Sequence, residues 1–315
     1  MWKWFALGLG WLVPLSAQAN DSTAALTAGG LVLTKTDAIA METERLVITP
    51  DSVSVGYRFR NVTDKPVVTQ VAFPLPDLSL SDAFYGHPAI PSDDPLNFVG
   101  FQTQADGNPV DAKAQVRFRV NDADVTDRFL QLGLVPSLAD PGVHKVFDTE
   151  AARDNLKALG ASLEGALSDL TQQTTFHWRQ SFPPAKEVEI AHRYRPVAGF
   201  QNLSQLEWRK LSTTAFKELF CLDDGAARGI ESYLGTKAFY PTRTVRYVLM
   251  TGNNWAGGIG HFKLQVRPSG EFEVAIFCKP DGSGGVAGRT LELNFKNFSP
   301  KRDLDILFIG RRGGY

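Results

Sequence analysis

The sequence predicts a mainly β protein with two antiparallel β-sandwich-like domains and a helical insertion in the first. Short segments that alternate apolar and polar residues recur along the chain, and Gly, Pro, Asn and Asp separate them. Segments with helical spacing are few. At 315 residues the chain is also long for one hydrophobic core, which favours two domains. We place these domains at 20–200 and 201–315, with the boundary near 197–205.

Residues 1–19, MWKWFALGLGWLVPLSAQA, have the pattern of a cleaved secretory signal. Lys3 is their only charge, an apolar run follows, and the A-x-A at 17–19 supplies a cleavage site. The alternative is an uncleaved membrane anchor, but the apolar run is shorter than the ~20 residues that span a bilayer. No later segment approaches that length. We therefore predict a signal peptide, a mature N-terminus at Asn20, and a periplasmic or secreted protein without a transmembrane segment after cleavage.

Half-buried antiparallel strands account for most of both domains, because alternation puts every second side chain on one face. The segment 174–190 also resembles 290–306: each has a proline between two alternating stretches, where a chain can turn from one strand to the next. This echo indicates a related unit near the end of each domain. The clearest strand-like segments are 53–61, 67–77, 112–121, 261–266 and 290–295.

Three segments carry helical signals. Thr126 can cap a short helix, and Asp148 or Thr149 can open a longer one with leucines at helical spacing. Together these two helices form the predicted insertion at about 126–172. Asp224 can cap the one short helix that we expect in the second domain.

The chain contains two cysteines, Cys221 and Cys278. In an oxidising compartment an even pair favours a disulfide, and Cys278 is in phase with the buried face of an alternating segment. A bridge of this loop length contributes ~4 kcal/mol through the unfolded state. The alternative, a catalytic thiol, needs a base nearby, and no histidine is adjacent to either cysteine in the sequence. We predict the disulfide.

A glycine-rich stretch, TGNNWAGGIGHFKLQV at 251–266, raises the question of a phosphate-binding loop. Its glycines lack the G-x-G-x-x-G spacing and an alternating segment follows, so no helix N-terminus is expected to bind phosphate. We interpret 251–260 as a connection between two antiparallel strands. Trp255 is either an aromatic plug over the end of the sandwich, which we favour, or a stacking surface for a ligand. If the protein binds a partner here, the predicted binding residues are Asn253, Asn254, Trp255 and His261.

Catalytic motifs are absent from the sequence, which contains no H-E-x-x-H, G-x-S-x-G or C-x-x-C. His192 shares a strand face with Val188, Ile190 and Tyr194. We therefore interpret His192 as a hydrogen-bonded core residue rather than a functional one. We predict no catalytic residue and no cofactor.

One loop groups His87, Asp93 and Asp94, which could hold a hard cation. Asp and Ser in a proline-containing loop are equally explained by turn formation without any ligand. We favour the turn and predict no metal site.

Several separated motifs resemble the bacterial family catalogued as domain of unknown function 4424. They are NDSTAALTAGGLVLTKTDAIAMETERLVIT, VAFPLPD, HRYRPVAG and TGNNWAGGIGHFKL, in this order, and the resemblance covers nearly all of the mature chain. It implies an exported bacterial protein and no activity that can be transferred. Residues 45–200 are also similar in layout to the vault and inter-alpha-trypsin module, which supports a β-sandwich. The long helical insertion departs from that module.

The formal net charge is −1, and signal cleavage removes only one lysine, so the mature chain stays near neutral. It therefore has no long-range field that would gather phosphates, and we expect no nucleic-acid partner. We predict an exported, non-enzymatic binding or structural module whose partner is a protein, a glycan or an envelope component. The alternative is a periplasmic hydrolase with a site assembled from distant residues. His192 and His177 with acids beside a serine in one cleft would favour that enzyme.

Overall fold

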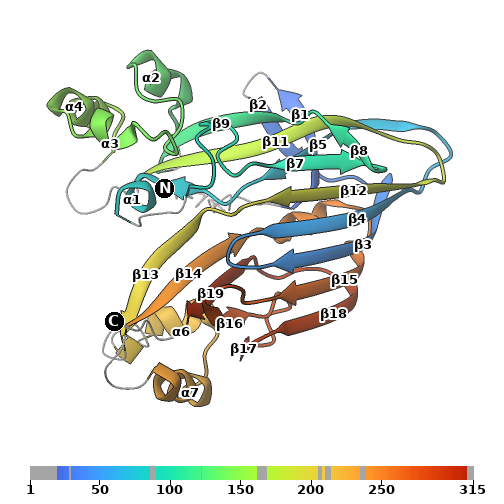
Figure 1. The fold of residues 1–315 in the computed structure, drawn as a ribbon. Helices are drawn as coiled ribbons and strands as arrows, with labels where there is room; N and C mark the ends of the chain where they lie inside the picture. The colour runs from blue at the N-terminus through green and yellow to red at the C-terminus, as the bar shows by residue number, and fades with distance from the viewer. Residues whose placement is uncertain are drawn as a thin grey trace, which may run out of the picture.

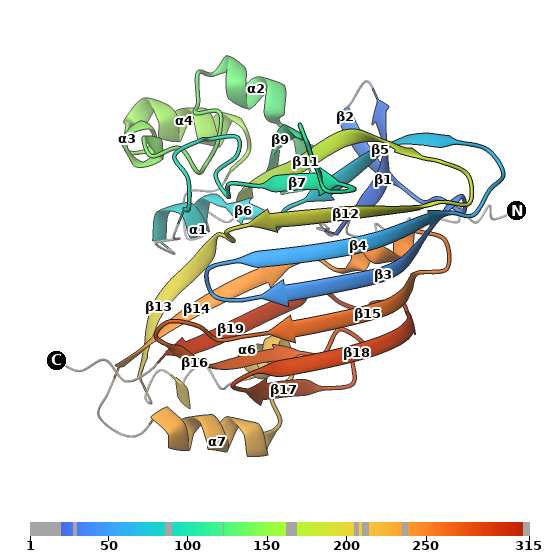
Figure 2. The same ribbon diagram turned by 45° about the vertical axis from the view of Figure 1, so that its right-hand side comes forward.

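The computed structural model describes residues 20–27, 30–85, 90–121, 123–161, 169–204, 208–209, 214–234 and 239–310. The protein is mainly β: its strands form three largely antiparallel sheets, and its helices are short. This confirms the predicted fold class. The predicted signal peptide at 1–19 lies outside the described residues. Figures 1 and 2 show one sheet, called sheet A and including residues 67–74 and 170–182, above a second, called sheet B and including residues 39–48 and 53–61. Helices α6 (Thr214–Phe220) and α7 (Asp224–Leu234) lie at the end of the molecule away from sheet A.

Sheet A has the strand order β10-β9-β11-β5-β1-β2, and β6 pairs with β11. Alternation on β11 sends Phe176 and Trp178 into the core and leaves His177 between them on the outer face. The strands of sheet A are β1 (Ser22–Thr27), β2 (Gly30–Thr34), β5 (Val67–Pro74), β6 (Leu78–Ser79), β9 (Lys113–Val120), β10 (Ala123–Asp124) and β11 (Leu170–Phe182).

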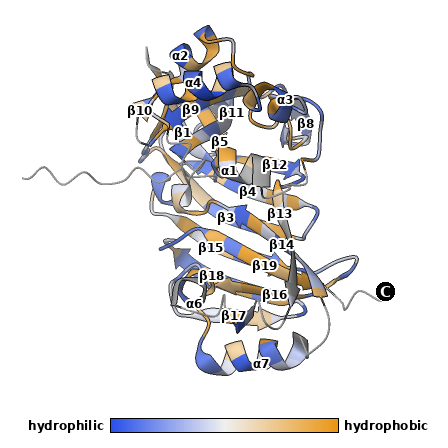
Figure 3. Ribbon diagram, turned by 90° about the vertical axis from the view of Figure 1, so that its left-hand side faces the viewer, coloured by the Kyte–Doolittle hydropathy of each residue, from blue (hydrophilic) through white to orange (hydrophobic). Residues whose placement is uncertain are grey.

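Sheet B has the order β18-β15-β3-β4-β12-β7-β8 and crosses the middle of Figure 1. Strand β15 runs parallel to β3, whereas β3 and β4 are antiparallel. Figure 3 shows the alternation of hydrophobic and hydrophilic residues along β3 and β15, which leaves one face of the sheet in solvent. The strands are β3 (Ile39–Ile48), β4 (Val53–Asn61), β7 (Gln102–Ala105), β8 (Asn108–Val110), β12 (Glu187–Tyr194), β15 (Ile259–Val266) and β18 (Leu291–Phe298).

Sheet C has the order β13-β14-β19-β16-β17. On β19, Ile306 and Phe308 join the main core, while Leu307 and Ile309 contact a second cluster that includes Phe220 of α6. Burial on both faces explains why β19 is continuously apolar from Ile306 to Ile309 instead of alternating. The strands are β13 (Ala198–Ser204), β14 (Phe239–Tyr247), β16 (Phe272–Cys278), β17 (Gly285–Gly288) and β19 (Leu304–Gly310).

The boundary expected near residue 200 falls inside β13 and does not separate the sheets. Strands β15 and β18 belong to the second half of the chain, yet they extend the sheet formed by β3, β4 and β12 of the first half. The main hydrophobic core likewise contains residues of all three sheets. The three sheets therefore share one core, and the division into domains at 20–200 and 201–315 stays a prediction.

The helices correct three sequence expectations. Thr149 caps α4 by accepting from the amide of Ala152, as predicted, but α4 ends at Ala158, and Leu170 already begins β11. Thr126 is the first residue of α2 rather than its cap. The second half contains α6 in addition to α7, where one helix was expected. The helices are α1 (Leu80–Tyr85), α2 (Thr126–Gln131), α3 (Val143–Phe147), α4 (Glu150–Ala158), α6 (Thr214–Phe220), α7 (Asp224–Leu234) and the 3-10 turn η2 (Met250–Asn254).

Candidate functional site

Asn20 and Asp21, the first residues after the predicted signal, lie buried where the three sheets meet. Neither has exposed surface. Beside them, the hydroxyls of Tyr57 from sheet B and Tyr247 from sheet C are 3.2 Å apart. The Tyr247 ring also contacts Phe73 of sheet A, with centroids 6.4 Å apart. The start of the described chain is therefore part of the common core.

Both the side chain and the backbone carbonyl of Asn20 are hydrogen-bonded in this position. Its Nδ2 donates to Glu44 Oε2 at 3.0 Å, and the Tyr57 hydroxyl donates to its Oδ1 at 2.5 Å. Thr251 Oγ1, from the η2 turn, donates to its carbonyl oxygen at 2.7 Å. Three distant segments thus converge on one residue, and the polar atoms involved are hydrogen-bonded, as buried polar groups require.

Glu44 reaches this cluster because of a register shift in β3. Ile39 and Met41 face the core, and strict alternation would continue with residues 43, 45 and 47. The pairing with β4 shifts between Met41 and Thr43, as at a β-bulge, and the inward positions become 44, 46 and 48. A carboxylate is thereby placed inside the molecule. Sequence alternation alone could not locate it, because an extra residue reverses the faces.

Asp21 and His192 form a buried pair. Asp21 Oδ1 lies 3.0 Å from His192 Nε2, and both side chains are wholly unexposed. The imidazole is packed among Phe73, Phe101 and Trp178, with ring centroids 5.0 to 5.3 Å away. This agrees with the interpretation of His192 as a hydrogen-bonded core residue. Asp21 Oδ2 and His192 Nδ1 have no hydrogen-bond partner among the described residues.

Burial dominates the ionisation of both carboxyl groups. It raises the pKa of Glu44 to about 8, against smaller lowering effects of the bonds from Asn20 and Tyr247. Burial also raises the pKa of Asp21, and the neighbouring His192 offsets part of this rise. These groups are closed off from solvent, so a substrate has no access to them in this conformation. The cluster organises the core.

Trp255 belongs to the same core. Its Nε1 donates to the carbonyl of Asp21 at 2.6 Å, and its ring packs on Phe59 with centroids 4.4 Å apart. Only 2% of the residue is exposed. The structure shows the aromatic plug, and the indole offers no free face on which a ligand could stack.

The loop around Trp255 connects two sheets, which corrects the expected link between paired strands. It runs from β14 in sheet C through η2 to β15 in sheet B. Asn253 Nδ2 donates to the carbonyl of Pro300 at 3.0 Å, and Asn254 Nδ2 donates to Ser22 Oγ at 2.9 Å. Both amides hold the loop against the rest of the protein. A binding role for Asn253 and Asn254 stays a prediction.

His261, the fourth predicted binding residue, lies on the solvent face of sheet B. It is exposed and lines a depression of about 440 Å³ together with residues of β3, β15 and β18. That volume falls within the range of small-ligand sites, roughly 300–1,000 Å³. The other lining residues are Thr43, Arg45, Leu46, Val47, Lys263, Gln265 and Asn294. His261 is therefore separated from Trp255, which points into the core.

Basic side chains are neighbours at and beside this depression. Arg45 is the register partner of Lys263, and His261 is that of Lys296. Lys263 Nζ pairs with Glu292 at 2.7 Å, and this contact together with Gln265 lowers the pKa of Glu292 to about 2. Within the described ranges, no acidic side chain forms an ion pair with Arg45 or Lys296. We call Arg45, His261, Lys263 and Lys296 the cationic face.

The histidines of the alternative hydrolase do not share a cleft. His177 lies on the outer face of sheet A, where its Nδ1 is 2.7 Å from Gln70 Nε2. Trp178 follows His177 on β11 and points to the inner face of sheet A, where it contacts His192. The sheet itself separates the two imidazoles.

The loop that contains Asp93 and Asp94 has the hydrogen bonds of a turn. Asp94 Oδ1 accepts from the amides of Leu96 and Asn97 at 2.9 and 3.0 Å, which agrees with the turn interpretation. His87 lies outside the described residues. A group of three or more metal-ligating side chains is not found in the part of the chain that the structure describes.

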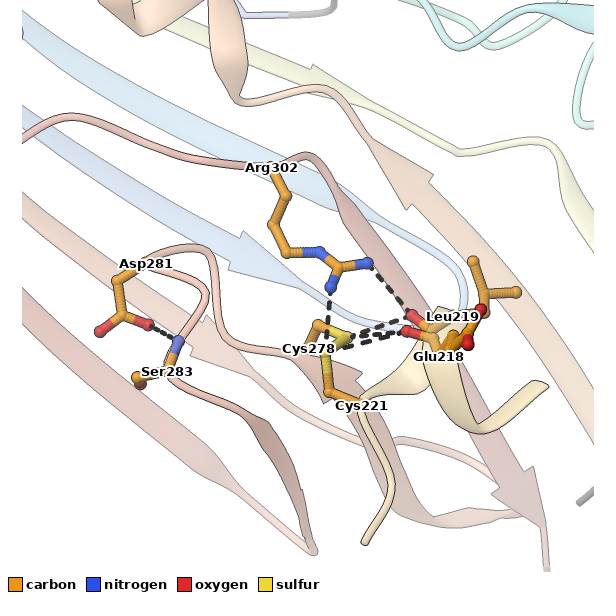
Figure 4. Close-up of a disulfide and its surroundings, with 7 residues drawn as sticks. All are labelled: Glu218, Leu219, Cys221, Cys278, Asp281, Ser283 and Arg302. Carbon is orange, nitrogen blue, oxygen red and sulfur yellow. Dashed lines mark hydrogen bonds between the residues drawn. A yellow bond between two sulfur atoms is a disulfide. The ribbon is translucent and has the colours of Figure 1, made fainter. Parts of the chain in front are cut away.

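The predicted disulfide between Cys221 and Cys278 is present, with the Cα atoms 5.0 Å apart. Cys278 ends β16 and Cys221 follows α6, so the bridge fastens α6 to sheet C. Figure 4 shows Arg302 beside it: Nη1 donates to Cys221 Sγ at 3.0 Å and Nη2 to the carbonyl of Leu219 at 3.3 Å.

A family model described as "Domain of unknown function (DUF4424)" matches residues 19–307 and confirms the resemblance seen in the motifs. Among curated proteins, none matches this chain. No helix within the described residues is long and apolar enough to cross a membrane. The similarity in layout to the vault and inter-alpha-trypsin module stays a prediction.

Solved structures resemble the chain only loosely. A protein of Legionella pneumophila, whose description proposes nutrient binding, aligns with a TM-score of 0.43 and 16% identity, over 93% of this chain and 70% of its own. An M1 zinc metallopeptidase of Deinococcus radiodurans aligns with a TM-score of 0.30 and 8% identity, over 88% of this chain. A two-domain M1 zinc metallopeptidase with bound L-tryptophan gives 0.31 and 9%, also over 88% of this chain. The chain spans 43% and 44% of these two peptidases.

Proposed function

We propose that this protein, which belongs to the family of domain of unknown function 4424, is an exported binding module that holds an anionic glycan of the cell envelope on its cationic face. Export is supported by the signal pattern at 1–19 and by the disulfide, which persists in oxidising compartments. A periplasmic location follows from the same two features.

The observation that carries the proposal is the side-by-side placement of Arg45 and Lys263 on a solvent-facing sheet. Like charges directly opposite one another destabilise a sheet. Lys263 is paired with Glu292, whereas Arg45 has no acidic ion-pair partner among the described residues. A carboxylated sugar between the two cations would offset the repulsion. Gly56, the other neighbour of Arg45, has open space where a side chain would stand, which leaves the guanidinium accessible.

The surrounding side chains suit a sugar. Thr43, Gln265 and Asn294 line the same depression and supply hydroxyl and amide groups that can bond sugar hydroxyls. The depression is shallow and lies on strands rather than loops, so its geometry is fixed by the β3–β15–β18 ladder. This arrangement favours an extended polar chain over a compact apolar ligand.

Calorimetry with oligogalacturonate, a carboxylated glycan, and with neutral dextran tests the proposal. We expect oligogalacturonate to bind and dextran not to bind. The affinity for oligogalacturonate should fall as the salt concentration rises, because salt screens exposed charges. Arg45→Gln should weaken binding about twofold to fivefold, the value of one exposed charge contact of ~0.5–1 kcal/mol. Lys65→Gln, in the exposed turn after β4, is the matched control and should bind normally. Equal binding of dextran, or an unaffected Arg45→Gln variant, would refute the cationic face as the site.

A further inference from the structure

The predicted mature N-terminus is in an unusual place. Chain ends usually lie at the surface and are poorly ordered. Here Asn20, Asp21 and Ser22 have no exposed surface, and Thr23 has 3%. Signal cleavage after Ala19 would therefore create a new charged end at a residue that is built into the core.

The acids around Asn20 have few basic partners. Glu44 and Asp21 are both fully buried carboxyl groups, and His192 is the one basic side chain bonded to either of them among the described residues. Within the same part of the chain, Asp21 Oδ2 has no hydrogen-bond partner. Buried carboxylates are stable only when paired and hydrogen-bonded, so a further cation beside Asn20 would stabilise the ionised form of these acids.

We propose that Glu44 and Asp21 form an internal receptor for the α-ammonium of Asn20, which hydrolysis of the Ala19–Asn20 peptide bond releases. In that step water adds across the amide: Ala19 leaves with the new carboxylate, and Asn20 keeps the amine, which takes up a proton. A signal peptidase of the export machinery supplies the catalysis. The ammonium then joins the His192 imidazole as a partner of the two carboxyl groups.

Both acids are neighbours of Asn20. The side chain of Asn20 already contacts Glu44 at 3.0 Å, and Asp21 is the adjoining residue. Thr251 holds the Asn20 carbonyl from the opposite side. Gly252 permits the close packing of Asn20, because a Cβ at position 252 would lie 3.2 Å from Asn20 Nδ2 and 2.8 Å from Ile259 Cδ1. Asn20 is thus fixed by contacts that survive cleavage.

Maturation then completes the fold. The titratable groups of the cluster around Asn20 are Asp21, Glu44 on β3, Tyr57 on β4, His192 on β12 and Tyr247 on β14, which belong to sheets B and C as well as to the start of the chain. A charged end held by these groups joins the sheets at one point. The inference rests on the proposed export, since it requires cleavage after Ala19.

Two proteins that differ by one residue test the receptor. Each is released from a cleavable fusion so that its first residue is either Asn20 or Ala19, and each is treated at neutral pH with an acetylating reagent. We expect the Asn20 amine to react at least about tenfold more slowly in the native than in the unfolded protein, because the reagent reaches it only after local opening. The Ala19 amine should lack this protection. Equal reactivity of the two native amines would overturn the inference.

Thermal melting supplies the second measurement. The protein that begins at Asn20 should melt several degrees higher than the one that begins at Ala19, and Glu44→Gln should abolish that difference. Glu292→Gln, which removes an exposed carboxylate, should leave it intact. An unchanged difference in Glu44→Gln would also overturn the receptor.

The mass of the protein recovered from the periplasm separates this inference from the proposed export. A chain that begins at Asn20 with a fully reactive amine would refute the receptor alone. A chain that still carries Met1 would refute cleavage and export. Neither result concerns glycan binding, which calorimetry measures.

Discussion

Asp21 and His192 are 171 positions apart in the chain, and their side chains meet at 3.0 Å with no exposed surface. The pair joins the start of the described chain to β12 in the middle of sheet B. Aromatic rings surround the imidazole, so water cannot replace either partner. An aspartate bonded to a histidine also occurs in catalytic dyads, but the burial of this pair in the core indicates a structural role.

Removing one partner of this pair should be costly. His192→Ala leaves the Asp21 carboxyl buried without its partner, and we expect the free energy of unfolding to fall by ~3–5 kcal/mol in urea titrations. His261→Ala, at an exposed position of β15 in the same sheet, is the control and should stay within about 0.5 kcal/mol of wild type. A His192→Ala protein as stable as this control would contradict the structural role.

Trp255→Ala should destabilise the core rather than a binding surface. The ring packs on Phe59 and Phe182, so its loss is a large-to-small core substitution that costs ~3–5 kcal/mol. The lost indole bond also leaves the Asp21 carbonyl unpaired. Thermal melts and glycan calorimetry on the same sample separate the two roles. A small stability change with a large loss of affinity would instead support a ligand-stacking tryptophan.

Glu44 should make stability pH-dependent in the protein that begins at Ala19. Its folded pKa of about 8 lies above the ordinary value of 4.5, so the folded state binds the extra proton between these values. The free energy of unfolding therefore falls as pH rises from 4.5 to 8, by at most about 1.4 kcal/mol per pH unit.

Urea titrations at several pH values measure this slope, and Glu44→Gln should reduce it. Asp21, whose pKa is also raised, adds a slope of the same sign, so the comparison is between variant and parent. In the protein that begins at Asn20, the ammonium should keep Glu44 ionised and flatten the curve. Identical slopes in parent and Glu44→Gln would show that Glu44 does not titrate in this window.

The disulfide should resist thiol reagents until reductant is added. Cys221 and Cys278 close a loop with a sequence separation of 57, which corresponds to ~4 kcal/mol of unfolded-state entropy. Cys278→Ser should lower the melting temperature accordingly, and its remaining thiol should become detectable. Two titratable thiols in the native, air-purified protein would disprove the bridge in solution.

Local patterns in the sequence were sufficient for the elements and for several interior residues. Alternation in 53–61 and 187–194 correctly put Tyr57 and His192 on buried faces, because period-two geometry leaves a strand few alternatives. Thr149 was recognised as a helix cap, and the two cysteines as a pair. Each of these conclusions depends on neighbours in sequence or on the redox chemistry of one residue type.

Only the tertiary structure decided how the strands are shared and where the polar core lies. The parallel pairing of β15 with β3 joins segments that are more than two hundred residues apart, and no local signal marks it. The register shift in β3 turns Glu44 inward, and the burial of Asn20 depends on β3, β4 and η2, which meet there. Such positions are set by the packing of distant segments, whose mutual fit is a property of the folded chain and not of any window of sequence.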